Sequence, residues 1–260
     1  YAGFLMGIVL WMHNYGRLKR FWEIKNYKLK IKGREGAGIW EKGAMFRFFQ
    51  VNRDIFLRTL CLVAVTLFFT SAGASQGEII LAVNTLLMQL FTLFSYVMDG
   101  FAYAGEALSG RYIGARNREA FTDTVRHLFG WGAVIAVLFT LVYALGGNAF
   151  LGLLTDDKEV IAVADTYFYW ALAVPAVGIA AFIWDGIFIG ATATRGMLLS
   201  MAAAAVSFFI LYYGLHPVLA NHALWLAFLT YLLMRGVVQT GLSREVIRRA
   251  FPSKKEPAWR

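Results

Sequence analysis

Long runs of apolar residues dominate the chain, and short polar connections separate them. Six of the runs reach the roughly 20 residues that a helix needs to cross the hydrocarbon core of a bilayer. They lie near residues 55–74, 79–109, 126–147, 160–193, 196–215 and 223–242. The pattern predicts an all-α integral membrane protein with six transmembrane helices in residues 54–243.

Composition supports this prediction, and charge adds an orientation. Hydrophobic residues make up 59% of the 260 residues, and the mean hydropathy is +0.57, above what a soluble core requires. Positive residues stay on the cytoplasmic side of a membrane. With residues 14–53 placed there, 24 of the 25 Lys and Arg residues fall on that side, and Lys158 falls outside. We therefore predict a multi-pass protein of the plasma (inner) membrane with a cytoplasmic C-terminus.

The same sorting explains the net charge of +9 as a surface that faces anionic lipid. The lipid bilayer is then the partner of these basic residues, and nucleic acid is not. A single Gly-rich stretch, "GREGAG", lacks the strand before it and the Gly-Lys-Ser/Thr after it that a phosphate-binding loop needs.

The segments outside the six runs have distinct characters. Residues 1–13 are apolar, too short to cross a bilayer and unlike a signal peptide, so we interpret them as the end of a truncated preceding helix. Residues 14–53 form a basic cytoplasmic linker, and its second half sets aromatic residues among charges, as an amphipathic helix at the membrane surface would. Residues 244–260 form a basic cytoplasmic tail.

A polar stripe runs along one face of the second predicted span. On a helix with 3.6 residues per turn, the residues that share this face are Asn84, Met88, Thr92, Ser95, Asp99 and Glu106. Such a stripe faces a bundle interior or a wet cavity rather than lipid. Asp99 and Glu106 are therefore candidate ligands for an ion or a substrate. For Asp99 a structural hydrogen bond is the alternative, and for Glu106 an interfacial ion pair.

Several uncharged residues are predicted to line this cavity. They are Asn84, Met88, Thr92, Ser95 and Tyr103, together with Thr66 and Thr70 of the first span. For the two threonines, packing between helices is the alternative interpretation.

The fourth predicted span carries another acid, Asp185, ten residues before Arg195. An acid inside a membrane costs about 2.5–3.5 kcal/mol on insertion scales and typically lines an ion or substrate path. Asp185 is therefore a third candidate ligand, with a structural hydrogen bond as the alternative. Pro175 removes one backbone hydrogen bond earlier in the same span, and Gly178 follows it, so we predict a hinge there.

Two segments resemble a known family. "DGFAYAGEALSGRYIGARNREAF" is similar to the signature of the multidrug and toxic compound extrusion (MATE) transporters, through Gly110, Gly114, Ala115 and Asn117. "WDGIFIGATATRGMLLSM" resembles the tenth helix of the DinF-like branch of that family. The resemblance covers residues 1 to about 250. It implies twelve helices in two lobes, with this chain holding the end of helix six, the inter-lobe linker and helices seven to twelve.

The resemblance also implies a function. MATE transporters are secondary antiporters that exchange protons or sodium for amphipathic, often cationic, organic compounds, so no other cofactor and no enzymatic activity are expected. Asp185 matches the acidic position used for cation binding in sodium-coupled NorM-like relatives, which makes it a possible sodium ligand. Their partner acid on the seventh helix is absent, because residues 55–77 contain no Asp or Glu. The implied partners are small organic substrates and the N-terminal lobe of the same protein.

Three alternatives remain open at this point. A flippase for lipid-linked saccharides would be favoured by basic residues inside the cavity, but the sequence places the membrane arginines at the interfaces. An intramembrane aspartyl protease would need Asp99 and Asp185 as a dyad, and its Gly-x-Gly-Asp motif is missing. A lobe that is inactive without its partner lobe is the third alternative.

Overall fold

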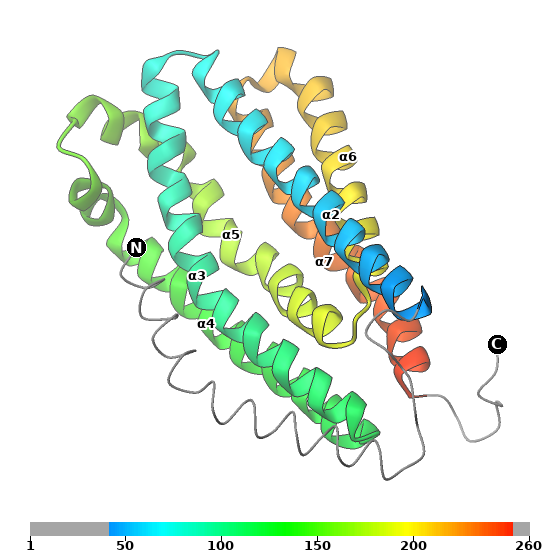
Figure 1. Ribbon diagram of the computed structural model, residues 1–260. Coiled ribbons are helices and arrows are strands. Elements are labelled where there is room, and N and C mark those ends of the chain that lie inside the picture. Colours follow the sequence, from blue (N-terminus) through cyan, green and yellow to red (C-terminus); the bar gives the residue numbers. More distant parts are fainter. Residues whose placement is uncertain (1–41, 252–260) are drawn as a thin grey trace, which may run out of the picture. The chain divides into compact units, whose positions relative to one another are not determined.

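The computed structural model describes residues 42–251. Within this range every element is an α-helix, and each of the six helices is long and apolar enough to cross a membrane. The helices are α2 (Lys42–Ala74), α3 (Glu78–Gly114), α4 (Arg118–Leu154), α5 (Lys158–Gly190), α6 (Thr194–Leu219) and α7 (Asn221–Ala250) (Figure 1). The predicted all-α membrane fold with six spans is confirmed.

The helices are longer than the apolar runs that predicted them. Hydropathy detects only the apolar middle of a helix, whereas Arg, Glu and Gln also favour helix and extend its ends. Residues 42–53 accordingly belong to α2 itself, and residues 244–250 of the predicted tail belong to α7. The segment 1–13, most of the linker and the end of the tail lie outside the described residues.

A kink interrupts α4 near its end. Gly147 has a φ of 19° and a ψ of −113°, which no helical residue adopts, and the helix then continues to Leu154. The predicted end of this span at residue 147 thus marks the kink rather than the end of the helix.

Two turns on the same side of the bundle have the same backbone geometry. After α3, Arg116 has a φ of 55° and the Asn117 N–H donates to Tyr112 O at 3.0 Å. After α5, Thr192 has a φ of 53° and the Ala193 N–H donates to Phe188 O at 2.8 Å. These bonds satisfy carbonyls that the helix ends would otherwise leave without a partner. In the first turn Asn117 also caps α4, because its side chain accepts from Ala120 N at 3.0 Å.

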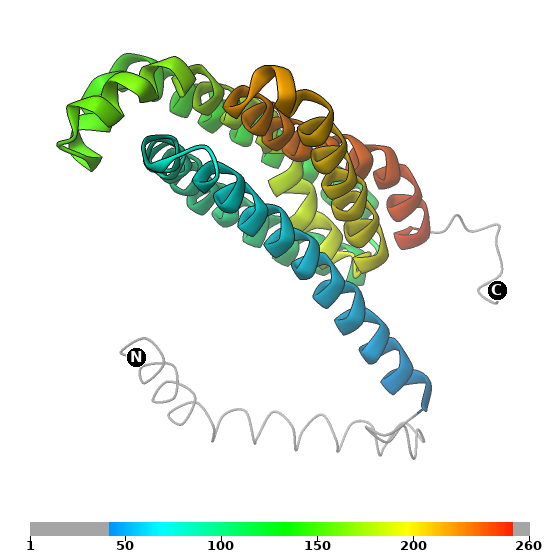
Figure 2. The ribbon, with the colours of Figure 1, turned by 90° about the horizontal axis from the view of Figure 1, so that it is seen from above.

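Helix α5 lies at the centre of the bundle. It packs against α3, α4 and α7, and α6 packs along α7, as the two views in Figures 1 and 2 show. The helix is buried continuously from Ala181 to Phe188. Asp185 therefore lies in the part of α5 that other helices enclose.

Glycine lets α3 and α5 touch through their backbones. A Cβ added at Gly186 would lie 2.0 Å from Ala102 O, and one added at Gly190 would lie 2.4 Å from Glu106 O. Gly100, which follows Asp99 as Gly186 follows Asp185, has nothing within 4 Å. The two Asp-Gly pairs of the sequence are therefore not equivalent, since only the second is required for close packing.

Helix α2 is attached to its neighbours in two different ways. Near its C-terminal end, the ring of Phe68 meets Tyr212 of α6 at 5.0 Å between centroids, and Phe69 meets Trp225 of α7 at 5.3 Å. Nearer its N-terminal end the contacts are polar, because Thr194 Oγ1 of α6 donates to Asp54 Oδ2 at 3.2 Å, and Arg58 reaches α5.

Candidate functional site

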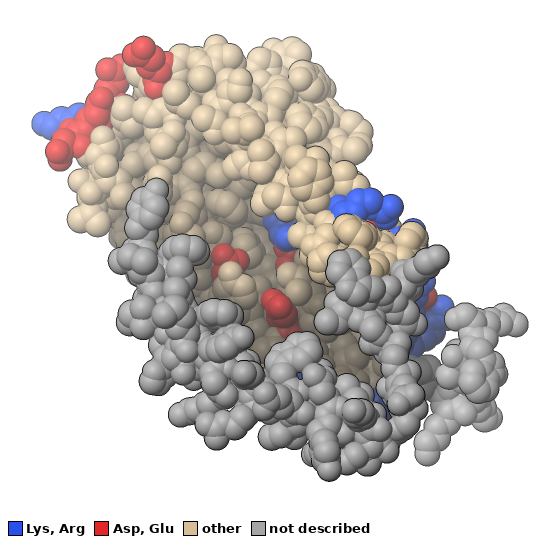
Figure 3. All heavy atoms as spheres, viewed as in Figure 1, with Lys and Arg blue, Asp and Glu red and all other residues tan. Residues whose placement is uncertain are grey.

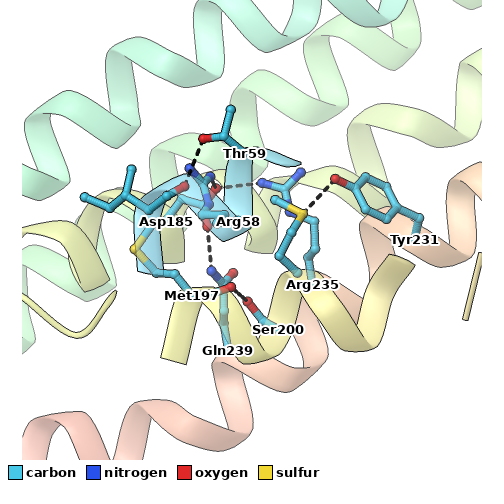
Figure 4. A network of polar contacts seen from close by, with 10 residues as sticks. Arg58, Thr59, Asp185, Met197, Ser200, Tyr231, Arg235 and Gln239 are labelled. Atoms are coloured by element: carbon cyan, nitrogen blue, oxygen red, sulfur yellow. Dashed lines mark hydrogen bonds and ion pairs between the residues drawn. The ribbon is translucent and has the colours of Figure 1, made fainter. Parts of the chain in front are cut away.

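Asp185 is the centre of a polar network inside the bundle (Figure 4). Its Oδ2 accepts hydrogen bonds from Arg58 Nη2 of α2 and, at 2.6 Å, from Arg235 Nη2 of α7. Its Oδ1 accepts from Gln239 Nε2 of α7 at 2.5 Å. One carboxylate therefore joins α2, α5 and α7, and both of its oxygens have partners.

The spacing along α7 explains how two of these partners converge. Arg235 and Gln239 are four residues apart, so they lie one above the other on the same face of the helix. One turn earlier on that face is Tyr231, whose ring centroid lies 5.6 Å from the Arg235 guanidinium carbon. The Tyr231 hydroxyl donates to Met201 Sδ of α6 at 2.9 Å. Arg235 is thus held between a carboxylate and an aromatic ring, and it is only 5% exposed.

The buried arginine corrects an expectation from the sequence. The sequence placed the membrane arginines at the interfaces, but Arg235 lies inside the bundle, and the Arg58 side chain is only 21% exposed. Sequence reasoning missed Arg58, Arg235 and Gln239 as site residues. A signal for the last two was present, since they recur at helical spacing with Tyr231 in a span that is otherwise mainly apolar.

The network does not balance its own charge. Asp185 carries one negative charge, and the two guanidinium groups on it carry two positive ones. Arg58 Nε, Arg235 Nε and Gln239 Oε1 are buried without a hydrogen-bond partner among the described residues. Buried polar groups rarely remain unpaired, so these atoms mark a place where water or a ligand completes the site.

This arrangement bears on the expected role of Asp185 as a sodium ligand. Sodium is held by oxygen atoms, yet each Asp185 oxygen already accepts from an N–H group, and two cations lie beside it. Within residues 42–251 no group of three or more His, Cys, Asp or Glu side chains is placed to hold a metal ion. Asp185 is an ion-pair partner of the two arginines in this structure.

Asp99 lies close to this network without joining it. It interacts electrostatically with Asp185, Arg235 and Arg58. Its carboxylate makes no hydrogen bond or ion pair with a described residue, and it is partly exposed. Glu106, two turns further along α3, is also partly exposed. Asp99 is therefore the acid beside the network whose carboxylate is open to a proton or a ligand.

The other residues of the polar stripe divide into two groups. Met88, Thr92 and Ser95 are partly exposed, and the hydroxyls of Thr92 and Ser95 donate to carbonyls of their own helix at 2.8 Å. Tyr103 is 70% exposed, whereas Asn84 is 2% exposed and lines no surface. The prediction of Asn84 as a cavity residue is wrong, because that end of the stripe turns into the bundle.

Asn84 instead fastens α3 to α7. Its Nδ2 donates to Asn221 Oδ1 at 2.8 Å, and its Oδ1 accepts from Asn221 Nδ2 at 3.0 Å and from Trp225 Nε1 at 2.8 Å. All three side chains are buried, so each hydrogen bond replaces one to water.

Asn84→Leu is expected to destabilise the bundle by about 2 kcal/mol, because it leaves the Asn221 amide and the Trp225 N–H without partners. Thermal unfolding in detergent measures the effect. Thr92→Val is the matched control on the same helix, since its hydroxyl bonds only to its own helix, and a change below about 0.5 kcal/mol is expected. An Asn84→Leu variant as stable as the control would show that these hydrogen bonds contribute nothing.

Thr66 and Thr70 are exposed on α2, and their hydroxyls donate to carbonyls of their own helix. Pro175 and Gly178 are buried in α5, and the helix continues through both. Bending at this point stays a prediction.

The face between α3 and α2 is hollowed, and charged side chains of both signs gather in it (Figure 3). The hollow therefore has the two features of a site in a membrane protein, namely access and uncompensated charge. Ionisable groups placed inside a bundle at such cost are typical of proteins that move ions or solutes across membranes. The fold and the site together thus define a polytopic membrane protein with a charged internal site.

The chain belongs to the MatE family, whose model matches residues 55–218. It is 41% identical over 212 residues to DNA damage-inducible protein F of Escherichia coli (strain K12), and this match covers 80% of this chain and 46% of that protein. It is 26% identical over 133 residues to Protein DETOXIFICATION 45, chloroplastic, of Arabidopsis thaliana, covering 51% of this chain and 24% of that one. The resemblance to MATE transporters and to their DinF-like branch is thereby confirmed.

A solved structure shares the fold. "Crystal structure of MATE in the bent conformation" superposes with a TM-score of 0.64 at 17% sequence identity, covering 81% of this chain and 46% of that chain. The chain thus spans about half the length of the relatives that it matches over most of its own length.

Proposed function

We propose that this chain is the C-terminal six-helix lobe of a secondary antiporter that exports amphipathic, often cationic, organic compounds. The observation that carries the proposal is the open carboxylate of Asp99 beside the Asp185 network. Membership of the MatE family and the name of the DETOXIFICATION relative support export as the direction. The match covers only 46% of the E. coli relative, which supports an N-terminal lobe as the partner of this chain.

The proposed setting is the plasma membrane, with the start of α2 and the end of α7 on the cytoplasmic side. The distribution of Lys and Arg supports this orientation. Alternating access then follows from one lobe rocking against the other around the site.

Protons are proposed as the coupling ion in preference to sodium. A proton needs only one acceptor, which Asp99 offers, whereas sodium needs several oxygen ligands without adjacent cations. The arginines on Asp185 disfavour sodium there.

Charge provides the exchange mechanism. With Asp99 and Asp185 ionised, their two charges balance those of Arg58 and Arg235, and a cationic compound is attracted to Asp99. Protonation of Asp99 leaves one net positive charge, which repels that compound. Proton and substrate thus exclude each other at one carboxylate, and this differential binding couples their fluxes.

A flippase for lipid-linked saccharides is the second candidate. The two arginines inside the bundle favour it, because guanidinium groups bind phosphate well. Asp185 neutralises one of the two charges, and the open group nearby is an acid, so the antiporter is the better supported function.

Asp99→Asn is expected to abolish gradient-driven uptake of a fluorescent organic cation, because an amide cannot exchange a proton. The measurement uses everted vesicles that carry the protein with both lobes, under an imposed proton or sodium gradient. Asp123→Asn, an acid on α4 whose side chain is 56% exposed, is the control that should keep wild-type uptake. Uptake that persists in Asp99→Asn would reject Asp99 as the coupling group. Uptake driven by sodium alone would reject the proton.

A further inference from the structure

The two arginines on Asp185 differ in their freedom. Arg235 is enclosed, with Tyr231 and Phe182 rings at 5.6 and 5.9 Å from its guanidinium carbon. Arg58 approaches from α2 without such a ring contact among the residues that the structure describes, and its side chain is 21% exposed against 6% for Arg235. Arg235 is therefore the enclosed cation beside Asp185, and Arg58 is the second, more accessible one.

The guanidinium of Arg58 retains binding capacity. Its Nη2 is bonded to Asp185, and its Nε has no partner among the described residues. Its Nη1 makes no hydrogen bond with a residue in 42–251, and the side chain is 21% exposed. An arginine with donors to spare and a surplus positive charge is a site for an anionic group such as a carboxylate.

An opposite charge lies nearby on the facing helix. Asp99 of α3 interacts electrostatically with Arg58, and its own carboxylate forms no ion pair with a described residue. The hollow between α3 and α2 presents acidic and basic side chains together (Figure 3). A ligand that carries one positive and one negative group would pair with both Asp99 on α3 and Arg58 on α2. A simple cation would pair with Asp99 and leave Arg58 without an additional partner.

We infer that Arg58 is a substrate-binding residue and that the site selects amphiphiles carrying an anionic group, such as a carboxylate, beside their cationic one. This inference rests on the proposed function and specifies its substrate class. The cationic group of the ligand lies at Asp99, and its anionic group lies at Arg58. Arg235 continues to neutralise Asp185 while the anionic group of the ligand pairs with Arg58.

The test compares two dyes that differ in a single charge. A rhodamine ethyl ester is a permanent cation, and the corresponding free acid is a zwitterion at neutral pH. Proton-driven uptake of both is measured in vesicles with the two-lobe protein, for wild type, Arg58→Gln and Arg58→Lys. The quantity compared is the ratio of zwitterion uptake to cation uptake, which is independent of the amount of folded protein.

Wild type is expected to take up the zwitterion at least as fast as the ester. Arg58→Gln is expected to lower the uptake ratio about tenfold, as the loss of one charge-assisted hydrogen bond of about 1.4 kcal/mol predicts. Arg58→Lys should restore most of the ratio, which a purely structural role of Arg58 would not require. Ester uptake with no zwitterion uptake, or a ratio unchanged in Arg58→Gln, would overturn the inference and leave the antiporter standing. Absence of driven uptake for both dyes would overturn the proposed function itself.

Discussion

Asp185→Asn is expected to destabilise the bundle by about 3–5 kcal/mol, because it removes the ion-pair partner of the buried Arg235 and of the partly buried Arg58. Arg235 suffers most, since it is 5% exposed and cannot turn toward water. The free energy of unfolding in detergent measures the loss. Asp123→Asn on α4 is the matched control, and because its carboxylate lies 4.0 Å from Arg126 at the surface, a change below about 0.5 kcal/mol is expected.

A second variant separates charge from shape. Replacing Asp185 by Leu together with Arg58→Met and Arg235→Met removes all three charges at similar volume, and such replacements of buried ion pairs are often neutral or stabilising. Stability near wild type is therefore expected for the triple variant. If Asp185→Asn alone unfolded no more easily than Asp123→Asn, the charges would not be buried as described.

Gly186→Ala is expected to cost about 3 kcal/mol or more, because its methyl group would lie 2.0 Å from Ala102 O and would force α3 away from α5. Gly100→Ala is expected to stabilise the protein instead. No atom lies within 4 Å of its added methyl, and Ala stabilises a helix interior by up to about 1 kcal/mol relative to Gly. Thermal unfolding of the two variants side by side provides the measurement. Similar melting temperatures for both would contradict the backbone contact between the helices.

The spans of this protein could be predicted from sequence because length and hydropathy alone determine whether a helix crosses a bilayer. The ends of the helices could not, since polar residues such as Arg118 and Arg244 continue a helix beyond the apolar run. The turn after Gly114 could be recognised from sequence because it resembles a family motif, and the structure shows that Asn117 caps the next helix.

The site was predictable in part. Helical periodicity placed Asp99 on a polar face of one helix, but it does not determine which other helix packs against that face. Asn84 shares the face and is nevertheless buried, because α7 brings Asn221 and Trp225 against it. The partners of Asp185 were missed for the same reason, since Arg58 lies 127 positions away in the chain and Arg235 lies 50 away.

The unequal attachment of α2 allows one part of the helix to move while another stays fixed. Ring contacts of Phe68 and Phe69 fix the helix near its C-terminal end, and the ion pair of Arg58 and the hydrogen bond to Asp54 hold it nearer the N-terminal end. Ten residues of helix separate Arg58 from Phe68, or about 15 Å at the usual rise. A tilt of about 10° around these ring contacts would move Arg58 by about 2.6 Å, enough to break its hydrogen bond to Asp185. Loss of the Arg58–Asp185 ion pair would therefore release one end of this stretch of α2, while the ring contacts of Phe68 and Phe69 hold the other.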